Sequence, residues 1–178
     1  MLEPRETKLR RRTDQSYVHF RRLRTTALMD ENFVILLAED DANDAWLVKR
    51  ALFRGGVHNP IMVVRDGQEA IDYLEGIGPF ADREQFPLPT LALLDIKMPK
   101  KNGLEVLEWV RHNGSGGLKL MPVIIMSSSS IQEDIDRAYQ LGVNAYLVKP
   151  TAFNELVETL KTTTEFWKDF VAHPSKTK

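Results

Sequence analysis

Short apolar runs alternate with stretches of helical spacing along most of the chain. Each run lacks an internal polar position, as expected of a strand that is buried on both faces of a parallel sheet. Five such runs predict five strands, at residues 33–38, 61–64, 91–94, 123–126 and 145–148.

Each predicted strand is followed by apolar residues that recur every three or four positions, the spacing of one helix face. The inward-facing residues of the five predicted helices are Ala45, Val48 and Leu52; Ala70, Ile71 and Leu74; Leu104, Leu107 and Val110; Ile131, Ile135, Ala138 and Leu141; and Phe153, Leu156, Val157 and Leu160. Gly55-Gly56 ends the first helix, and the last one reaches about Phe170. Ser130 and Glu133 have the spacing of a capping box, which predicts a helix start at Ile131.

Strand–helix alternation of this kind predicts an α/β domain with a parallel sheet and helices on both of its faces. The connection at residues 76–89 contains glycine and proline, and it is longer than usual for such a domain. A length of 178 residues is enough for one domain with a substantial core.

Charge separates the first 28 residues from the rest. They carry eight Lys/Arg and three Asp/Glu, a net charge of +5, so residues 29–178 carry −6 of the total of −1. We therefore expect a basic arm at 1–28, a folded domain at 29–171 that begins near Met29, and a short tail at 172–178. A nucleic-acid or membrane-surface role for the arm stays open, although an acidic body does not favour DNA.

Composition excludes several kinds of protein. The chain has no cysteine, so a disulfide framework and a thiolate metal site are both impossible. We find no apolar run near 18 residues and no signal-peptide core after the basic start, so we expect a cytoplasmic protein without a membrane span.

Polar residues follow four of the predicted strands directly. They are Glu39 and Asp40 after the first strand, Asp95 after the third, Ser127 after the fourth and Lys149 after the fifth. Ligands of open parallel sheets bind beyond the carboxyl ends of the strands, so these side chains should meet at one edge.

Three carboxylates at one edge repel one another unless a cation joins them, and oxygen ligands favour Mg²⁺. A carboxylate beside that ion can attack phosphorus and form an acyl phosphate. Ser127 could then donate to the phosphoryl oxygens, and Lys149 could pair with their charge. Taken singly, each group also fits a cap or a turn; the prediction depends on their occurring together.

Several motifs resemble response-regulator receiver domains of two-component signalling, from Phe33 to about Lys161. The resemblance is carried by residues 35–41, 93–99, 102–103, 122–127 and 142–150, which read ILLAEDD, LLDIKMP, NG, PVIIMS and GVNAYLVKP. It implies a flavodoxin-like (βα)5 fold with strand order 2-1-3-4-5. Glu39 for the first Asp of the acidic pair and Ser127 for Thr are common variants, and the basic arm lies outside the family pattern.

The resemblance assigns a role to each polar residue of this edge. Asp95 is the phosphoacceptor, and Glu39, Asp40, Asp95 and the backbone carbonyl of Lys97 hold Mg²⁺. The remaining roles are a switch formed by Ser127 and Tyr146, phosphoryl pairing by Lys149, and tuning of dephosphorylation by Lys97 and Ser129. The Lys149–Pro150 bond is expected to be cis.

The resemblance also implies a partner and an output. The phosphoryl donor is a histidine kinase, and the loop before the third strand is similar to that of small stand-alone regulators, some of which serve bacterial phytochrome kinases. Output is expected through the surface of the fourth helix, fifth strand and last helix, which could bind another protein or a second copy. Tyr146 could also be a static core residue.

Two other functions are alternatives for this sequence, a phosphatase and a nucleic-acid binder. An Asp-nucleophile phosphatase of the dehalogenase type needs a second acid two residues after the nucleophile, where this chain has Lys97. A nucleic-acid binder would act through the arginines at 10–12 and 21–24, but no recognition helix or stacking platform accompanies them.

Overall fold

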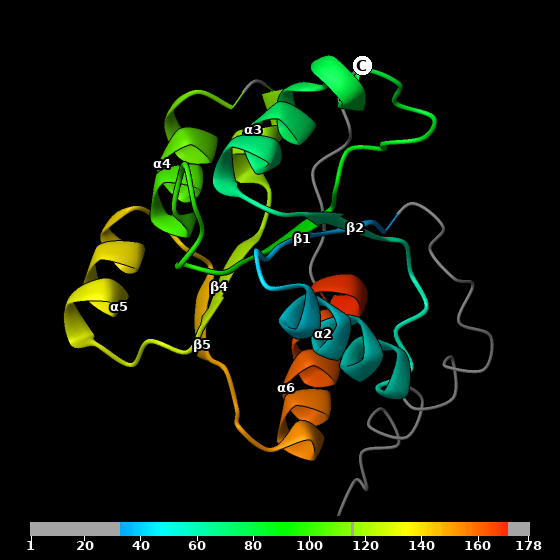
Figure 1. The fold of residues 1–178 in the computed structure, drawn as a ribbon, viewed down its shortest axis with the longest axis vertical. Coiled ribbons are helices and arrows are strands. Elements are labelled where there is room, and N and C mark those ends of the chain that lie inside the picture. The colour runs from blue at the N-terminus through cyan, green and yellow to red at the C-terminus, as the bar shows by residue number, and fades with distance from the viewer. Residues whose placement is uncertain (1–32, 115, 171–178) are drawn as a thin grey trace, which may run out of the picture. The chain divides into compact units, whose positions relative to one another are not determined.

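The computed structural model describes residues 33–114 and 116–170, and five parallel strands form its centre (Figure 1). The strands are β1 (Ile35–Ala38), β2 (Ile61–Val64), β3 (Leu91–Leu94), β4 (Val123–Ser127) and β5 (Ala145–Val148). All neighbouring strands pair in parallel, in the order β2-β1-β3-β4-β5. This confirms the flavodoxin-like (βα)5 fold and the order 2-1-3-4-5.

Helices cover both faces of the sheet. The helices α2 (Ala42–Arg54) and α6 (Phe153–Glu165) pack on one face; α3 (Gly67–Glu75), α4 (Gly103–His112) and α5 (Gln132–Gln140) lie on the other (Figure 1). Successive strand residues point to opposite faces, so Leu36 belongs to the core under α3 and α4, and Leu37 to the core under α2 and α6. Both leucines are fully buried, which is why the strands show continuous apolar runs.

The long connection between α3 and β3 is closely packed. The Tyr73 hydroxyl donates to the Pro87 carbonyl at 2.6 Å, and Arg83 donates to the carbonyls of Leu74 at 2.8 Å and Tyr73 at 2.7 Å. Arg83 therefore pairs with carbonyls at the end of α3, where that of Tyr73 also accepts from the Gly76 N–H at 3.2 Å. Gly76 lies between them with φ 73°, and a Cβ there would come within 2.5 Å of the Arg83 guanidinium. Only glycine suits both constraints.

The start of α5 differs from the prediction. The helix begins at Gln132, one residue later than expected, and the helix N-cap, Ile131, makes no side-chain capping bond. The Ser130–Glu133 capping box is wrong: Ser129, not Ser130, turns inward, and its hydroxyl donates to Asp134 at 2.6 Å. Ile131 is 59% exposed, so it lies outside the apolar face predicted for this helix, whereas Ala138 is buried.

The last helix changes geometry near its end. The α-helical part stops at Glu165 and is followed by a π-helical segment, Phe166–Phe170. The basic arm at 1–28, the proposed start at Met29 and the tail at 172–178 lie outside the described residues. In the part that is described, no helix combines the length and the apolar character that crossing a bilayer requires.

Candidate functional site

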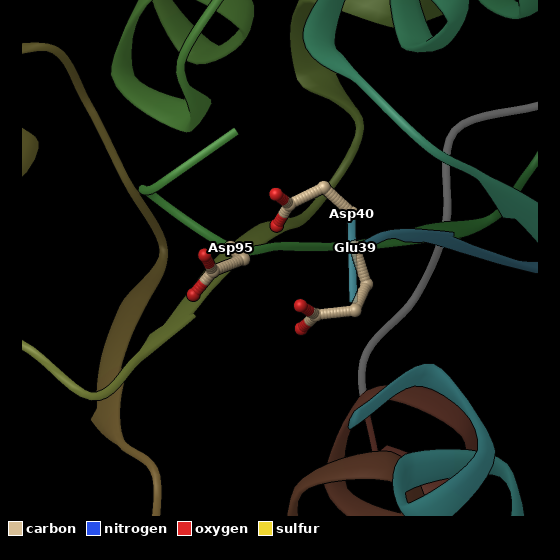
Figure 2. A group of neighbouring side chains, drawn as sticks. All are labelled: Glu39, Asp40 and Asp95. Carbon is tan, nitrogen blue, oxygen red and sulfur yellow. The ribbon is translucent and has the colours of Figure 1, made fainter. Parts of the chain in front are cut away.

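Three carboxylates converge where β1 and β3 end. Ala38 and Leu94 are paired in register, so Glu39 and Asp95, which follow them, leave the sheet side by side. Figure 2 shows the side chains of Glu39, Asp40 and Asp95 as neighbours at this edge, and one oxygen of each lies within 4.8 Å of the others. Glu39 is 3% exposed and Asp95 7%, whereas Asp40 is exposed. The site is thus buried on the sheet side and open above it.

Lys149 supplies the positive charge at this edge. Its Nζ lies 2.6 Å from Glu39 Oε2, 3.1 Å from Asp44 Oδ2 and 3.4 Å from Asp95 Oδ1. Burial alone would lower the pKa of Lys149, but the hydrogen bond to Glu39 and the charges of Asp95 and Glu39 raise it above its usual value. The side chain therefore stays an ammonium ion at physiological pH.

Burial and pairing also oppose each other at Glu39, with the signs reversed from those at Lys149. Burial raises the pKa of this carboxyl, and its hydrogen bond to Lys149 offsets only part of that rise. Four carboxylates, those of Glu39, Asp40, Asp44 and Asp95, share this edge with one ammonium ion, which contacts three of them. The excess of negative charge, offered entirely by oxygen atoms, suits a hard divalent cation.

The loop after Asp95 is held close to the site by backbone contacts. The Lys97 N–H donates to Asp95 Oδ2 at 2.9 Å, and the Gly103 N–H donates to the Ile96 carbonyl at 3.1 Å. A Cβ at Gly103 would lie 2.2 Å from the Asp95 carbonyl oxygen, so only glycine allows the loop to return this tightly. Asn102 and Glu105 form a reciprocal capping box that begins α4 at this point.

Ser127 and Tyr146 are linked through Ser129. Ser127 is fully buried at the end of β4, and its Oγ accepts from the Ser129 N–H at 3.2 Å. The Tyr146 hydroxyl, which is partly buried, donates to the Ser129 carbonyl at 2.9 Å. Burial raises the pKa of Tyr146, so this hydroxyl remains a donor. Asp134 accepts from the Ser129 hydroxyl and so fixes the loop between β4 and α5.

The structure brings Glu39, Asp40, Asp95 and Lys149 together as predicted at the carboxyl end of the sheet. The expected cis bond is wrong: no peptide bond in the described residues is cis, and Lys149–Pro150 is trans. A bond before proline favours trans by only about 0.5–1 kcal/mol, so its neighbours decide its form.

Asp44 was not predicted. It lies in the first turn of α2, where an acidic residue is already explained by the helix dipole. Its contact with Lys149 joins residues 105 positions apart, so no local pattern announces it.

Comparisons with a family model and with curated proteins indicate the same family. Residues 35–161 match the response regulator receiver domain. Among curated proteins, the chain is 38% identical over 141 residues to the probable methanogenesis regulatory protein FilR2 of Methanothrix harundinacea, a match that covers 78% of this chain and 85% of that protein. It is 34% identical over 142 residues to response regulator Rcp1 of Synechocystis sp., covering 80% and 93%.

Solved structures agree. The phosphorylated cyanobacterial phytochrome response regulator RcpA is similar with a TM-score of 0.73 at 36% identity, covering 81% of this chain and 99% of that one. The Mn²⁺-bound form of Rcp1 has a TM-score of 0.70 at 34% identity, covering 80% and 99%. Fold, acidic site and sequence therefore agree: the chain belongs to the response regulator receiver domain family, signalling proteins rather than classical enzymes.

Proposed function

We propose that Asp95 accepts a phosphoryl group from the phosphohistidine of a histidine kinase. One observation carries the proposal: Asp95 lies 3.4 Å from the Lys149 ammonium, inside a cluster of three carboxylates that suits a divalent cation. A carboxylate oxygen of Asp95 forms the new bond to phosphorus, and the phosphorus–nitrogen bond of the donor breaks. The departing imidazole keeps that electron pair, and it leaves as neutral imidazole because its ring takes up one proton from solvent.

Mg²⁺ would be held by Glu39, Asp40, Asp95 and the backbone carbonyl of Lys97, and it would neutralise the charge that gathers during transfer. The chain's own groups do the rest. Lys149, already beside Asp95, pairs with the phosphoryl oxygens, and the buried Ser127 hydroxyl donates to them. Lys97 and Ser129 flank the site and tune the rate at which water removes the group. The ion found in the related Rcp1 structure is also divalent.

Phosphorylation would then act through the loop between β4 and α5. The phosphorylated side chain carries up to about −2 of charge where the carboxylate carried −1, and this change at a fixed point biases an existing equilibrium of the domain. A shift of Ser127 toward that charge moves Ser129 as well, because the Ser129 N–H donates to the Ser127 hydroxyl. The hydrogen bond from the Tyr146 hydroxyl to the Ser129 carbonyl is then altered. Tyr146 is the side chain that moves with Ser127.

The output surface is formed by α5, β5 and α6. Exposed apolar side chains lie on or directly after these elements: Tyr139 is 55% exposed, Val148 47% and Phe166 51%. Such a surface suits another protein or a second copy of this chain. RcpA, a phytochrome response regulator, is similar over most of the chain, which supports a phytochrome-type histidine kinase as donor. A cytoplasmic site of action belongs to the same proposal.

Labelling with radioactive acetyl phosphate in Mg²⁺ tests the proposal. We expect the wild-type chain to be labelled and Asp95→Asn to remain unlabelled, because the amide is not a nucleophile toward phosphorus. Asn keeps an oxygen for the Lys97 N–H, so the variant should fold. Persistent labelling of Asp95→Asn would refute the assignment. Light scattering of the same samples reports whether phosphorylation changes the molar mass, which separates self-association from binding to another protein.

A further inference from the structure

Asp44 is bound to the lysine of the site although it belongs to neither the carboxylate cluster nor the sheet. Its Oδ2 lies 3.1 Å from Lys149 Nζ, closer than the 3.4 Å of Asp95 Oδ1. We propose that Asp44 is a positioning residue, which holds the Lys149 ammonium beside Asp95 once a divalent cation has bound Glu39. The inference rests on the phosphotransfer proposed above.

The Lys149 ammonium has more than one acceptor. A lysine has three N–H donors, and in this structure three carboxylates surround them, those of Glu39, Asp44 and Asp95. Glu39 makes the shortest contact, at 2.6 Å, but it also belongs to the cation cluster. A divalent cation largely neutralises the charge of a carboxylate that binds it, so the attraction of that carboxylate for Lys149 weakens.

The other two acceptors differ in one respect. Asp95 is the reacting group, and its oxygens change partners during transfer. Asp44 neither reacts nor belongs to the carboxylate cluster, so among the three described carboxylates in contact with the Lys149 ammonium it alone keeps its contact throughout. Lysine has a flexible four-carbon chain, and without this acceptor its ammonium would be free to leave the phosphoryl position.

Local structure makes Asp44 suitable for this task. It lies in the first turn of α2, and its backbone N–H donates to the capping carboxylate of Asp41 at 3.1 Å. The side chain of Asp44 is 47% exposed, whereas that of Lys149 is 15% exposed. Asp44 therefore reaches the ammonium from a fixed helix start at the edge of the site, and a partly hydrated pair should have a modest effect.

The direction of the effect distinguishes positioning from bulk charge. If Asp44 were only one more negative charge, its removal would reduce the repulsion of an anionic phosphodonor and speed transfer. If it positions Lys149, its removal slows transfer even at saturating Mg²⁺. The two roles thus predict opposite signs for one substitution.

The first test measures labelling of the full chain by acetyl phosphate at saturating Mg²⁺. We expect Asp44→Asn to be labelled roughly fivefold more slowly than wild type, equivalent to ~1 kcal/mol. Asp44→Glu should restore much of the rate. Glu155→Gln is the matched control: it removes an exposed acid from the first turn of α6, and its rate should equal that of wild type. In a Lys149→Ala background, Asp44→Asn should have no further effect, because the two act as one unit.

The second test does not depend on transfer. In protein with ¹⁵N-labelled lysine, the Lys149 ammonium signal should be protected from exchange in wild type with and without Mg²⁺. In Asp44→Asn it should be lost when Mg²⁺ is added. An unchanged signal, or a labelling rate at or above that of wild type, would overturn the role of Asp44 alone. A wild-type chain that takes no label on Asp95 would overturn the proposed function and this inference together.

Discussion

The two ends of the sheet handle charge in opposite ways. At the carboxyl end, one ammonium ion contacts three carboxylates, and the buried Glu39 has a raised pKa. Near the other end, the half-buried Arg111 donates to the carbonyls of Gly142 at 2.9 Å and Met121 at 3.0 Å. It also donates to the Lys119 carbonyl at 3.1 Å and to Asn144 Oδ1 at 2.8 Å. At the carboxyl end, the carboxylates outnumber the positive charges that could pair with them. At the other end, the single charge of Arg111 has several hydrogen-bond acceptors.

This difference separates function from stability. Burial lowers the pKa of Arg111, yet four of its five N–H donors already have hydrogen-bond partners within the domain. A bound cation stabilises the carboxylate cluster, because it relieves the repulsion among the three carboxylates. Substitutions at the two ends should therefore change different observables.

The largest effect on stability is expected at Arg111. Arg111→Met removes the donors to the carbonyls of Gly142, Lys119 and Met121, and leaves Asn144 Oδ1 with only the Val123 N–H. We expect the free energy of unfolding to fall by about 2 kcal/mol, because four hydrogen bonds are lost and most of them, being exposed to water, each contribute near the low end of the usual range. Urea unfolding measures this. Phosphorylation of the folded variant should match wild type, and a large loss of labelling with intact stability would contradict the separation.

The sequence predicts the parts of both ends that depend on local pattern. Strands appear as uninterrupted apolar runs because both faces of the sheet are covered, and the acids at their ends are then placed by topology alone. Arg111 and Asp44 could not be identified in this way, because their partners lie 31 and 105 positions away. The start of α5 was misplaced because Ser129 and Ser130 look equivalent in sequence, and only packing decides which one turns inward.

The next effect concerns the carboxyl end. Mg²⁺ should raise the free energy of unfolding of wild type, by about 1.4 kcal/mol at ten times its dissociation constant. For a chain of this size that is a rise of roughly 3–5 °C in the unfolding midpoint. Asp40→Asn should lose most of this rise, since it removes one of the three clustered carboxylates. Thermal unfolding with MgCl₂, compared with NaCl at equal ionic strength, measures it; an equal rise in the variant would place the ion elsewhere.

The smallest effect is the pH dependence that the buried Glu39 gives to the metal-free protein. Its pKa in the folded state is raised, chiefly by burial, so the folded state binds a proton more readily than the unfolded chain does. The stability that this group contributes is therefore full below its unfolded value of about 4.5 and is lost as the pH rises through the folded pKa. Relative to Glu39→Gln, wild type should gain stability between pH 7 and pH 4.5, as measured by urea unfolding in EDTA.

Asp66 provides a control of opposite sign. Burial tends to raise its pKa, but the hydrogen bonds from Lys100 and from the Glu69 N–H lower it below 3.8. Its contribution to stability is present above that value and is lost as the pH falls through the folded pKa. As the pH falls below 4, wild type should therefore lose stability relative to Asp66→Asn. As the pH falls from 7 to 4.5, it should gain stability relative to Glu39→Gln. If both differences ran in the same direction, the rise that burial gives to the Glu39 pKa would be mistaken, because both carboxyls have a lysine partner at a similar distance, 2.6 Å and 2.7 Å, and differ in how strongly burial acts on them.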